Sequence, residues 1–217
     1  MNPPKIKICC IRTVEEAHLA VSCGASALGL VSAMPSGPGV IDEDNIANII
    51  RCVPPPIATF MLTSLQNADA IIDQQHRCRP NTLQLVDSVA EAELIRLRHA
   101  LPGIALVQVI HVGGPESIIE ACAVAPHVDA ILLDSGNQKL DIKELGGTGR
   151  THDWAISREI RERCGKPVYL AGGLRAENVR IAIDHVQPFG LDICSGVRTA
   201  GDLDKSKLRA FILAARQ

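Results

Sequence analysis

The amino-acid sequence predicts an α/β protein in which eight parallel strands close into a (β/α)8 TIM barrel. Eight short apolar runs, rich in β-branched residues, alternate with eight longer segments of helical period. The units recur every ~20–30 residues, and parallel strands require helical crossovers of this kind. Eight such units can close a ring without an exposed sheet edge, and 217 residues lie near the lower limit for this fold. An open doubly wound sheet, usually of about five or six strands, is the alternative.

The predicted elements follow one another along the whole chain. No linker, low-complexity tract or change of composition marks a boundary, so we expect a single domain over residues 1–217. The run Pro54-Pro55-Pro56 suits a rigid loop between a helix and a strand. The predicted strands are residues 5–9, 27–31, 57–62, 82–85, 104–110, 130–133, 168–171 and 191–194. The predicted helices are residues 14–22, 43–52, 68–77, 90–98, 115–124, 154–163, 176–184 and 205–215.

The first helix shows both the period and the end signals that support these assignments. Its apolar residues Ala17, Ala20 and Val21 recur on one face. Thr13 precedes Glu16 at the spacing of a capping box. Gly24 follows the last turn, where glycine commonly ends a helix.

The composition excludes several classes of protein. Hydrophobic residues make up 47% of the chain and charged residues 21%, which is enough apolar material for a core and argues against disorder. The formal net charge is -2 and no basic run is present, so we expect no nucleic-acid partner. Aromatic residues are only 2%, too few for base-stacking platforms.

The sequence also predicts where the protein resides. No apolar stretch reaches the ~18 residues that span a bilayer, and the N-terminus lacks the long apolar segment of a signal peptide. The eight cysteines include no C-x-x-C pair and are too sparse for a disulfide scaffold. We therefore expect a cytoplasmic monomer or homodimer with reduced thiols and no membrane partner.

In a parallel barrel the chemistry lies where strands end, which directs attention to two residues. Cys9 ends the first predicted strand, and Lys7, two residues earlier on the same face, can favour its thiolate. The alternative is that Cys9 is a small buried apolar residue, as most cysteines are. Asp134 follows the sixth strand and no helix begins at once, so it suits an acid in the site better than a helix cap.

Glycine-bearing segments follow three successive strands. The sixth strand leads to Gly146-Gly147-Thr148-Gly149, the seventh to Gly172-Gly173, and the eighth to Ser195-Gly196. Glycine lets backbone N–H groups approach an anion, and the loops after the last two strands of such barrels often bind phosphate. The sequence therefore predicts a phosphorylated small-molecule ligand.

The seven histidines do not predict a metal site, because no two of them have the i,i+4 spacing of a ligand pair. His111 follows the fifth strand and is a candidate for the barrel mouth. Asp192 points into the barrel from the eighth strand and either supports the site or pairs with Lys7. Lys7, Arg12, His111 and Asp192 are the candidate substrate-binding side chains.

Taken together, these segments resemble the phosphoribosylanthranilate isomerase family of tryptophan biosynthesis, over almost the whole chain. The resemblance is specific because the pieces occur jointly and in order. They are Lys7-Ile8-Cys9, Leu133-Asp134-Ser135, Gly146-Gly147-Thr148-Gly149 with Asp153-Trp154, Leu170-Ala171-Gly172-Gly173-Leu174, Glu177-Asn178-Val179, and Asp192 with Ser195-Gly196-Val197.

The resemblance implies an isomerase with the TIM-barrel fold that works without cofactor or metal. It implies that Cys9 is the general base and Asp134 the general acid of an Amadori rearrangement, an aldose-to-ketose conversion. It also implies that backbone groups bind the substrate phosphate around Gly147, Gly149, Gly172, Gly173, Ser195 and Gly196.

The chain departs from the family mainly where the anthranilate end is expected. The family usually has glycine where this chain has Cys10, and a Ser-Pro-Arg segment where it has Ser32-Ala33-Met34. The histidine of Gln-Leu-His-Gly is replaced by Val86, and the glutamate after the eighth strand by Arg198. Three interpretations stay open here: Arg12 or Arg198 replaces the missing arginine, the aglycone differs, or the protein binds its ligand without turnover.

Overall fold

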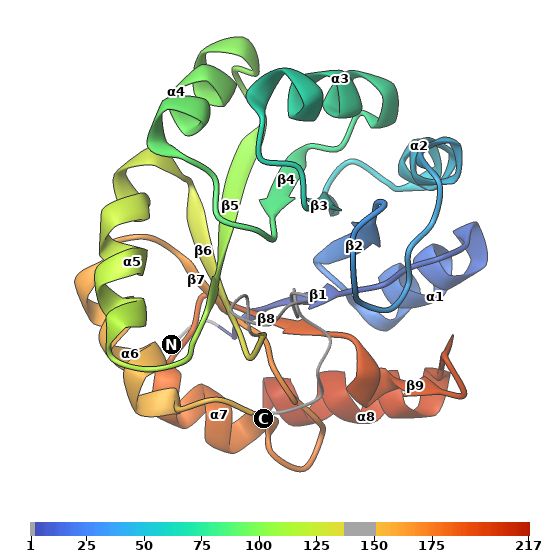
Figure 1. Cartoon of the computed structure of the whole chain (residues 1–217). Coiled ribbons are helices and arrows are strands. Elements are labelled where there is room, and N and C mark those ends of the chain that lie inside the picture. Colours follow the sequence, from blue (N-terminus) through green and yellow to red (C-terminus); the bar gives the residue numbers. More distant parts are fainter. Residues whose placement is uncertain (1–2, 137–150) are drawn as a thin grey trace.

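The computed structural model describes residues 3–136 and 151–217. Eight parallel strands close into a barrel in the order β1-β2-β3-β4-β5-β6-β7-β8. Figure 1 shows this ring of strands with the helices around its outside. The predicted TIM barrel is confirmed, and the open sheet is wrong because β1 pairs with β8 as well as with β2.

The strands and helices alternate as expected. The barrel strands are β1 Lys5–Ile8, β2 Ala27–Val31, β3 Ala58–Thr63, β4 Thr82–Leu85, β5 Ala105–His111, β6 Ala130–Asp134, β7 Val168–Leu170 and β8 Gly190–Ile193. The helices are α1 Val14–Cys23, α2 Glu43–Cys52, α3 Ala68–Cys78, α4 Glu91–Ala100, α5 Glu116–Val124, α6 Trp154–Arg163, α7 Val179–Val186 and α8 Lys205–Arg216. No helix in the described ranges is long and apolar enough to cross a membrane.

The caps of α1 have the geometry that the sequence predicts. The Thr13 side chain accepts a hydrogen bond from the Glu16 N–H. Gly24 ends the helix in the left-handed region, at φ 104°, and its N–H reaches the carbonyls of Ala20 and Val21. Local signals therefore fix both ends of this helix.

Several elements differ from the predicted ones. Helix α7 begins at Val179 instead of residue 176, because the Asn178 side chain accepts the N–H of Arg175 and holds a turn there. Three short pieces were not predicted at all. They are the 3-10 helices η1 Ala125–His127 and η2 Ser195–Val197 and a small hairpin of β9 Arg198–Thr199 and β10 Asp202–Leu203.

The period-two alternation of the strands divides the apolar residues into two layers. Ile6, Ile8 and Met61 belong to the cluster between the strands and the helices. Phe60 and Leu62 belong to a second cluster, which fills the inside of the ring. Neighbouring residues of one strand therefore serve opposite faces.

A buried ion pair lies inside the ring at the seam where the barrel closes. Lys7 of β1 and Asp192 of β8 are direct register partners, and Lys7 Nζ lies 2.8 Å from Asp192 Oδ1. Lys7 is fully buried and its ammonium lies 5.3 Å from the centre of the Phe60 ring. Burial disfavours the charge of Lys7, but the Asp192 carboxylate outweighs it, so the pKa of Lys7 lies above its ordinary value.

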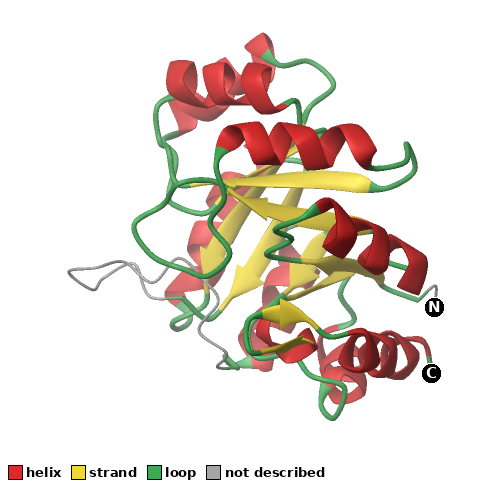
Figure 2. Ribbon diagram, turned by 90° about the vertical axis from the view of Figure 1, so that its right-hand side faces the viewer, coloured by secondary structure: helices red, strands yellow, loops and turns green. Residues whose placement is uncertain are grey.

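The first described residues and the C-terminus lie at one end of the barrel, the end that faces right in Figure 2. Pro3, Pro4 and Gln217 line one groove there together with Val168, the first residue of β7. The strands begin at this end, so the opposite end carries the strand C-termini and the mouth.

We predict that Lys7→Met destabilises the protein by about 3–5 kcal/mol, because it leaves Asp192 as an unpaired charge inside the barrel. Urea unfolding measures this loss. Lys5→Met, at the exposed start of the same strand, is the matched control and should change stability by no more than about 0.5 kcal/mol. Adding Asp192→Asn to Lys7→Met should restore part of the loss, and equal effects of the two lysine variants would contradict the prediction.

Candidate active site

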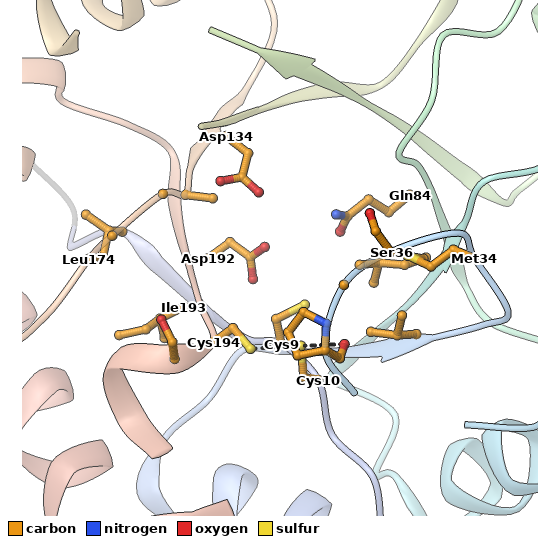
Figure 3. Close-up of a pocket in the computed structure, with 18 residues that line it drawn as sticks. Cys9, Cys10, Met34, Ser36, Gln84, Asp134, Leu174, Asp192, Ile193 and Cys194 are labelled. Atoms are coloured by element: carbon orange, nitrogen blue, oxygen red, sulfur yellow. Dashed lines mark hydrogen bonds between the residues drawn. The ribbon is translucent and has the colours of Figure 1, made fainter. Parts of the chain in front are cut away.

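A cavity that is open to solvent lies at the mouth of the barrel. Figure 3 shows the side chains of Cys9, Gln84, Asp134 and Asp192 around a common space. The complete lining is Cys9, Cys10, Val31, Met34, Ser36, Gly37, Pro38, Leu62, Gln84, Asp134, Ala171, Gly172, Gly173, Leu174, Asp192, Ile193, Cys194 and Ser195. The two residues expected to act as base and acid therefore face one cavity.

Cys9 follows β1 directly and is held by both neighbouring strands. Its N–H donates to the Ile193 carbonyl at 2.8 Å. On the other side, a Cβ at Gly29 would lie 2.9 Å from both Cys9 Sγ and Lys7 Nζ. Glycine at this position of β2 therefore leaves room for the thiol, and the Lys7 ammonium places a positive charge beside the sulfur.

Asp134 is the last residue of β6, and only 9% of its surface is exposed. Its Oδ1 accepts a hydrogen bond from the Ser135 N–H at 2.7 Å. Ser135 and Gly136, which follow it, are not helical, and the next described helix begins at Trp154 with Asp153 as its cap. Asp134 thus has no capping role and presents its carboxyl group to the cavity.

The two last loops of the barrel are locked against each other. Gly172 and Gly173 follow β7 with φ of 81° and 61°, a left-handed conformation that glycine adopts without strain. The Asn178 amide donates to the Gly173 carbonyl at 3.0 Å. Gly196 packs so closely on the Leu174 carbonyl that any Cβ would collide with it. Gly147 and Gly149, the other two predicted phosphate-binding glycines, lie outside the described residues.

The structure separates the four candidate substrate-binding side chains. Asp192 lines the cavity, and Lys7 lies beneath it in the ion pair. His111 is not in the cavity lining, and its Nε2 lies 3.0 Å from the Val86 carbonyl oxygen. Arg12 points to the hairpin instead, where it donates to Asp202 at 2.6 Å and to the Gly201 carbonyl at 2.8 Å.

The Arg198 side chain holds the backbone that follows β1 at the mouth. Its side chain is 8% exposed and pairs with Glu16 at 2.8 Å, and its other Nη donates to the carbonyls of Cys9 and Cys10. Glu16 also accepts the N–H groups of Arg12 and Leu203. Burial opposes ionisation of Glu16, but the hydrogen bonds from Arg198 and these N–H groups outweigh it and hold the Glu16 pKa below its ordinary value.

Several lining residues were not among the sequence candidates. Gln84 reaches the cavity from β4, between Leu83 and Leu85, which face outward. Cys10 and Cys194 lie side by side on the lining, and the loop after β2 contributes Met34, Ser36, Gly37 and Pro38. Position directly after a strand was the available signal for Cys194, and alternation with outward-facing leucines was the signal for Gln84.

No group of three metal-ligating side chains occurs in residues 3–136 and 151–217. All eight cysteines are free thiols in the structure. The polar groups that line the cavity include two carboxyl groups, three thiols and the Gln84 amide.

A closed parallel barrel with acid and thiol groups gathered at its C-terminal mouth has the architecture of a barrel enzyme. Comparison with known proteins identifies the enzyme family. The family model of N-(5'-phosphoribosyl)anthranilate (PRA) isomerase matches residues 6–214. The chain belongs to this family of aldose–ketose isomerases.

Individual relatives agree with the family match. The chain is 36% identical to N-(5'-phosphoribosyl)anthranilate isomerase 2 of Methanosarcina mazei, over 98% of this chain and 94% of that protein. It is 35% identical to the corresponding isomerase of Haloarcula marismortui, over 98% of this chain and 96% of that one.

Solved structures show the same similarity. The PRA isomerase of Thermotoga maritima superposes with a TM-score of 0.84 at 28% identity, over 98% of both chains. A PRA isomerase in complex with reduced 1-(o-carboxyphenylamino)-1-deoxyribulose 5-phosphate gives a TM-score of 0.81 at 27% identity, again over 98% of both chains.

We predict that the Glu16–Arg198 pair makes stability depend on pH. A carboxyl group with a lowered folded-state pKa contributes stability above its unfolded pKa of about 4.3. That contribution is lost as the pH falls through the folded pKa. Glu16→Gln should cost about 1.5–3 kcal/mol at pH 7, because it removes charge-assisted hydrogen bonds, and progressively less toward pH 3.

Urea titrations of the variant and the parent between pH 3 and pH 7 test this expectation. Asp73→Asn, on the exposed face of α3, is the control and should leave the pH profile unchanged. A Glu16→Gln deficit that stays constant across this range would refute the assignment.

Proposed function

We propose that this chain isomerises N-(5'-phosphoribosyl)anthranilate, with Asp134 as the general acid and Cys9 as the general base. One observation carries the proposal: the thiol of Cys9 and the carboxyl group of Asp134 line the same cavity at the barrel mouth. They come from β1 and β6, so substrate lying between them can meet an acid and a base on different sides. An aldose–ketose rearrangement needs this pair of groups.

The rearrangement can be written through these two residues. Asp134 gives its proton to the furanose ring oxygen as the C1–O bond breaks, and the nitrogen lone pair forms a C1=N⁺ iminium. The Cys9 thiolate then removes the proton from C2, and that electron pair forms the C1=C2 bond of a neutral enolamine. Proton transfer from the C2 hydroxyl and to C1 completes the aminoketose. The substrate nitrogen is the electron sink, so no external oxidant or cofactor takes part.

The phosphate end of the substrate would lie against the loops after β7 and β8. Gly172, Gly173 and Ser195 line the cavity, and Gly196 follows in η2. The left-handed glycines present backbone N–H groups at this wall, and a hydrogen-bonded Asn178 holds their loop in place. Anchoring a distant phosphate orients the sugar between acid and base, which lowers the entropic part of the barrier.

The opposite wall would receive the aromatic ring of the aglycone. It consists of Met34, Ser36, Gly37 and Pro38 from the loop after β2. This loop holds no arginine, Arg12 pairs with Asp202, and Arg198 is engaged by Glu16 and by the backbone carbonyls of Cys9 and Cys10. This observation favours a second candidate, isomerisation of a related phosphoribosylamine whose aglycone carries no carboxylate.

Loss of anthranilate-substrate fluorescence on addition of the protein tests the first candidate directly. Turnover of other phosphoribosylamines without turnover of the anthranilate compound would establish the second.

We further propose that the protein works in a reducing compartment such as the cytoplasm, which the eight free cysteines favour. A relative from Thermotoga maritima is described as dimeric, and the expected monomer or homodimer stays a prediction for this chain.

We predict that Cys9→Ser and Asp134→Asn each lower kcat by about 10²–10⁴-fold, because each removes one proton-transfer group. The affinity for reduced 1-(o-carboxyphenylamino)-1-deoxyribulose 5-phosphate, measured by calorimetry, should stay within a few-fold of that of the parent protein. Cys52→Ser, at an exposed thiol at the end of α2, is the control and should keep full turnover. Near-normal kcat in either site variant would exclude that residue as acid or base.

We predict that Met34→Arg lowers KM for the anthranilate substrate by about tenfold or more. A guanidinium at this wall can bind the anthranilate carboxylate with charge-assisted hydrogen bonds, each about 1.5–3 kcal/mol. Steady-state kinetics measures the change. Met34→Leu keeps the apolar wall and should leave KM unaltered, so an equal KM for the two variants would speak against this placement of the aglycone.

A further inference from the structure

The sulfur atoms of two cysteines at the barrel mouth lie in very close contact. Cys194 Sγ is 2.8 Å from Cys10 Sγ, whereas the S–S bond of a disulfide is about 2.05 Å. The residues are 184 positions apart in the chain and follow β1 and β8. Closure of the barrel therefore brings them together, and both line the mouth cavity.

The surrounding contacts hold Cys10 in this position. Its φ is 62°, in the left-handed region that residues other than glycine seldom adopt. Arg198 donates to its carbonyl oxygen at 2.5 Å, and its thiol donates to the Pro38 carbonyl at 3.5 Å. Gly39 packs on the same residue, where a Cβ would lie 3.1 Å from Cys10 Cα. The thiol is thus fixed toward Cys194 by contacts on several sides.

The two thiols differ in exposure and charge. Cys194 is half-buried at the cavity wall, and Cys10 is 5% exposed behind it. The hydrogen bond between Cys194 and Cys10 lowers the pKa of Cys194, with help from Arg198 and against burial. Hydrogen bonds with Cys194 and Cys9, together with burial, raise the pKa of Cys10. Cys194 is consequently the more nucleophilic thiol and Cys10 the one that resolves.

We propose that Cys10 and Cys194 form a reversible modification site that low-molecular-weight disulfides oxidise to an intramolecular disulfide. In the first step the Cys194 thiolate attacks a small disulfide RSSR, and RS⁻ leaves. In the second step Cys10 loses its proton and attacks Cys194 Sγ, and the second RS⁻ leaves. Two protein thiols are oxidised and one RSSR is reduced to two RSH, which take up the two protons.

The disulfide would join the ends of β1 and β8 directly beside the catalytic machinery proposed above. Cys9 precedes Cys10, and Ser195 follows Cys194 in the proposed phosphate-binding loop. Shortening the S–S distance must shift one of these loops, so oxidation should lower turnover. This consequence rests on the proposed function, whereas formation of the bond does not.

A second thiol pair provides a matched comparison. Cys122 Sγ of α5 and Cys164 Sγ, at the C-cap of α6, lie 3.4 Å apart on the outside of the barrel. Burial and the bond with Cys122 raise the pKa of Cys164 to about 12. The Cys164 thiol is therefore less readily deprotonated than Cys194, and the two sulfurs are farther apart, so this pair should react more slowly.

The test treats the full-length protein with bis(2-hydroxyethyl) disulfide and follows intact mass and cysteine-linked peptides. We expect loss of two hydrogen masses without a retained adduct and a peptide that links Cys10 to Cys194. Cys10→Ser should retain one adduct at Cys194, because no resolving thiol remains, and Cys194→Ser should prevent the link. Cys164→Ser should form the link at the rate of the parent protein.

A link between Cys10 and Cys9, earlier linkage of Cys122 with Cys164, or a stable adduct on the parent protein would overturn the proposal. Isomerase activity is measured on the same samples, each variant against its own reduced form. We expect oxidation to lower turnover by about tenfold or more and a thiol reductant to restore it. A mapped link without any isomerase activity in the reduced parent would contradict the proposed function and leave the modification site standing.

Discussion

The barrel and its mouth depend on a charge pair at the seam where the ring closes. Lys7 and Asp192 face each other across the junction of β1 and β8, out of water, in the one register that aligns them. A one-residue slip of either strand would move its charged side chain to the helix-facing apolar layer, where it has no partner. Two residues further along, just after these strands end, the same register brings Cys9 and Cys194 to the cavity lining. The register of β1 against β8 therefore sets both the ion pair of Lys7 with Asp192 and the positions of Cys9 and Cys194.

Each side of the mouth is formed by the residues that follow a particular strand. The first and sixth strands carry the thiol and the carboxyl group, and the last two carry glycine-rich walls. The loop after β2 forms the remaining side. Membership of the PRA isomerase family agrees with this division, because one barrel end must hold a phosphate, a reacting sugar and an aromatic aglycone at once.

Most of the fold was predictable from the sequence, because strands and helices leave local periodic signals. All eight strands follow from short apolar runs, and Thr13 and Gly24 mark the ends of α1. The hairpin of β9 and β10 was not predictable, because strands of two residues are too short to show a periodic pattern of apolar residues. Arg12 accordingly looked available for substrate, although Asp202 of this hairpin binds it.

Site residues were predictable to the extent that their position along a strand decided their direction. Cys9, Asp134, Gly172 and Gly173 reach the cavity as expected from their places at strand ends. The contact of Cys10 with Cys194 was not predictable, since it depends on the three-dimensional closure of residues at opposite ends of the chain. The clamp of Arg198 on the Cys9 and Cys10 carbonyls has the same non-local origin. At the other end of the barrel, Pro3 and Gln217 border one groove, so a short peptide can join the termini and new ends can be opened in an exposed loop. The order of the units along the chain is therefore separable from the ring they build, and a circularly permuted chain should retain the described contacts of the mouth.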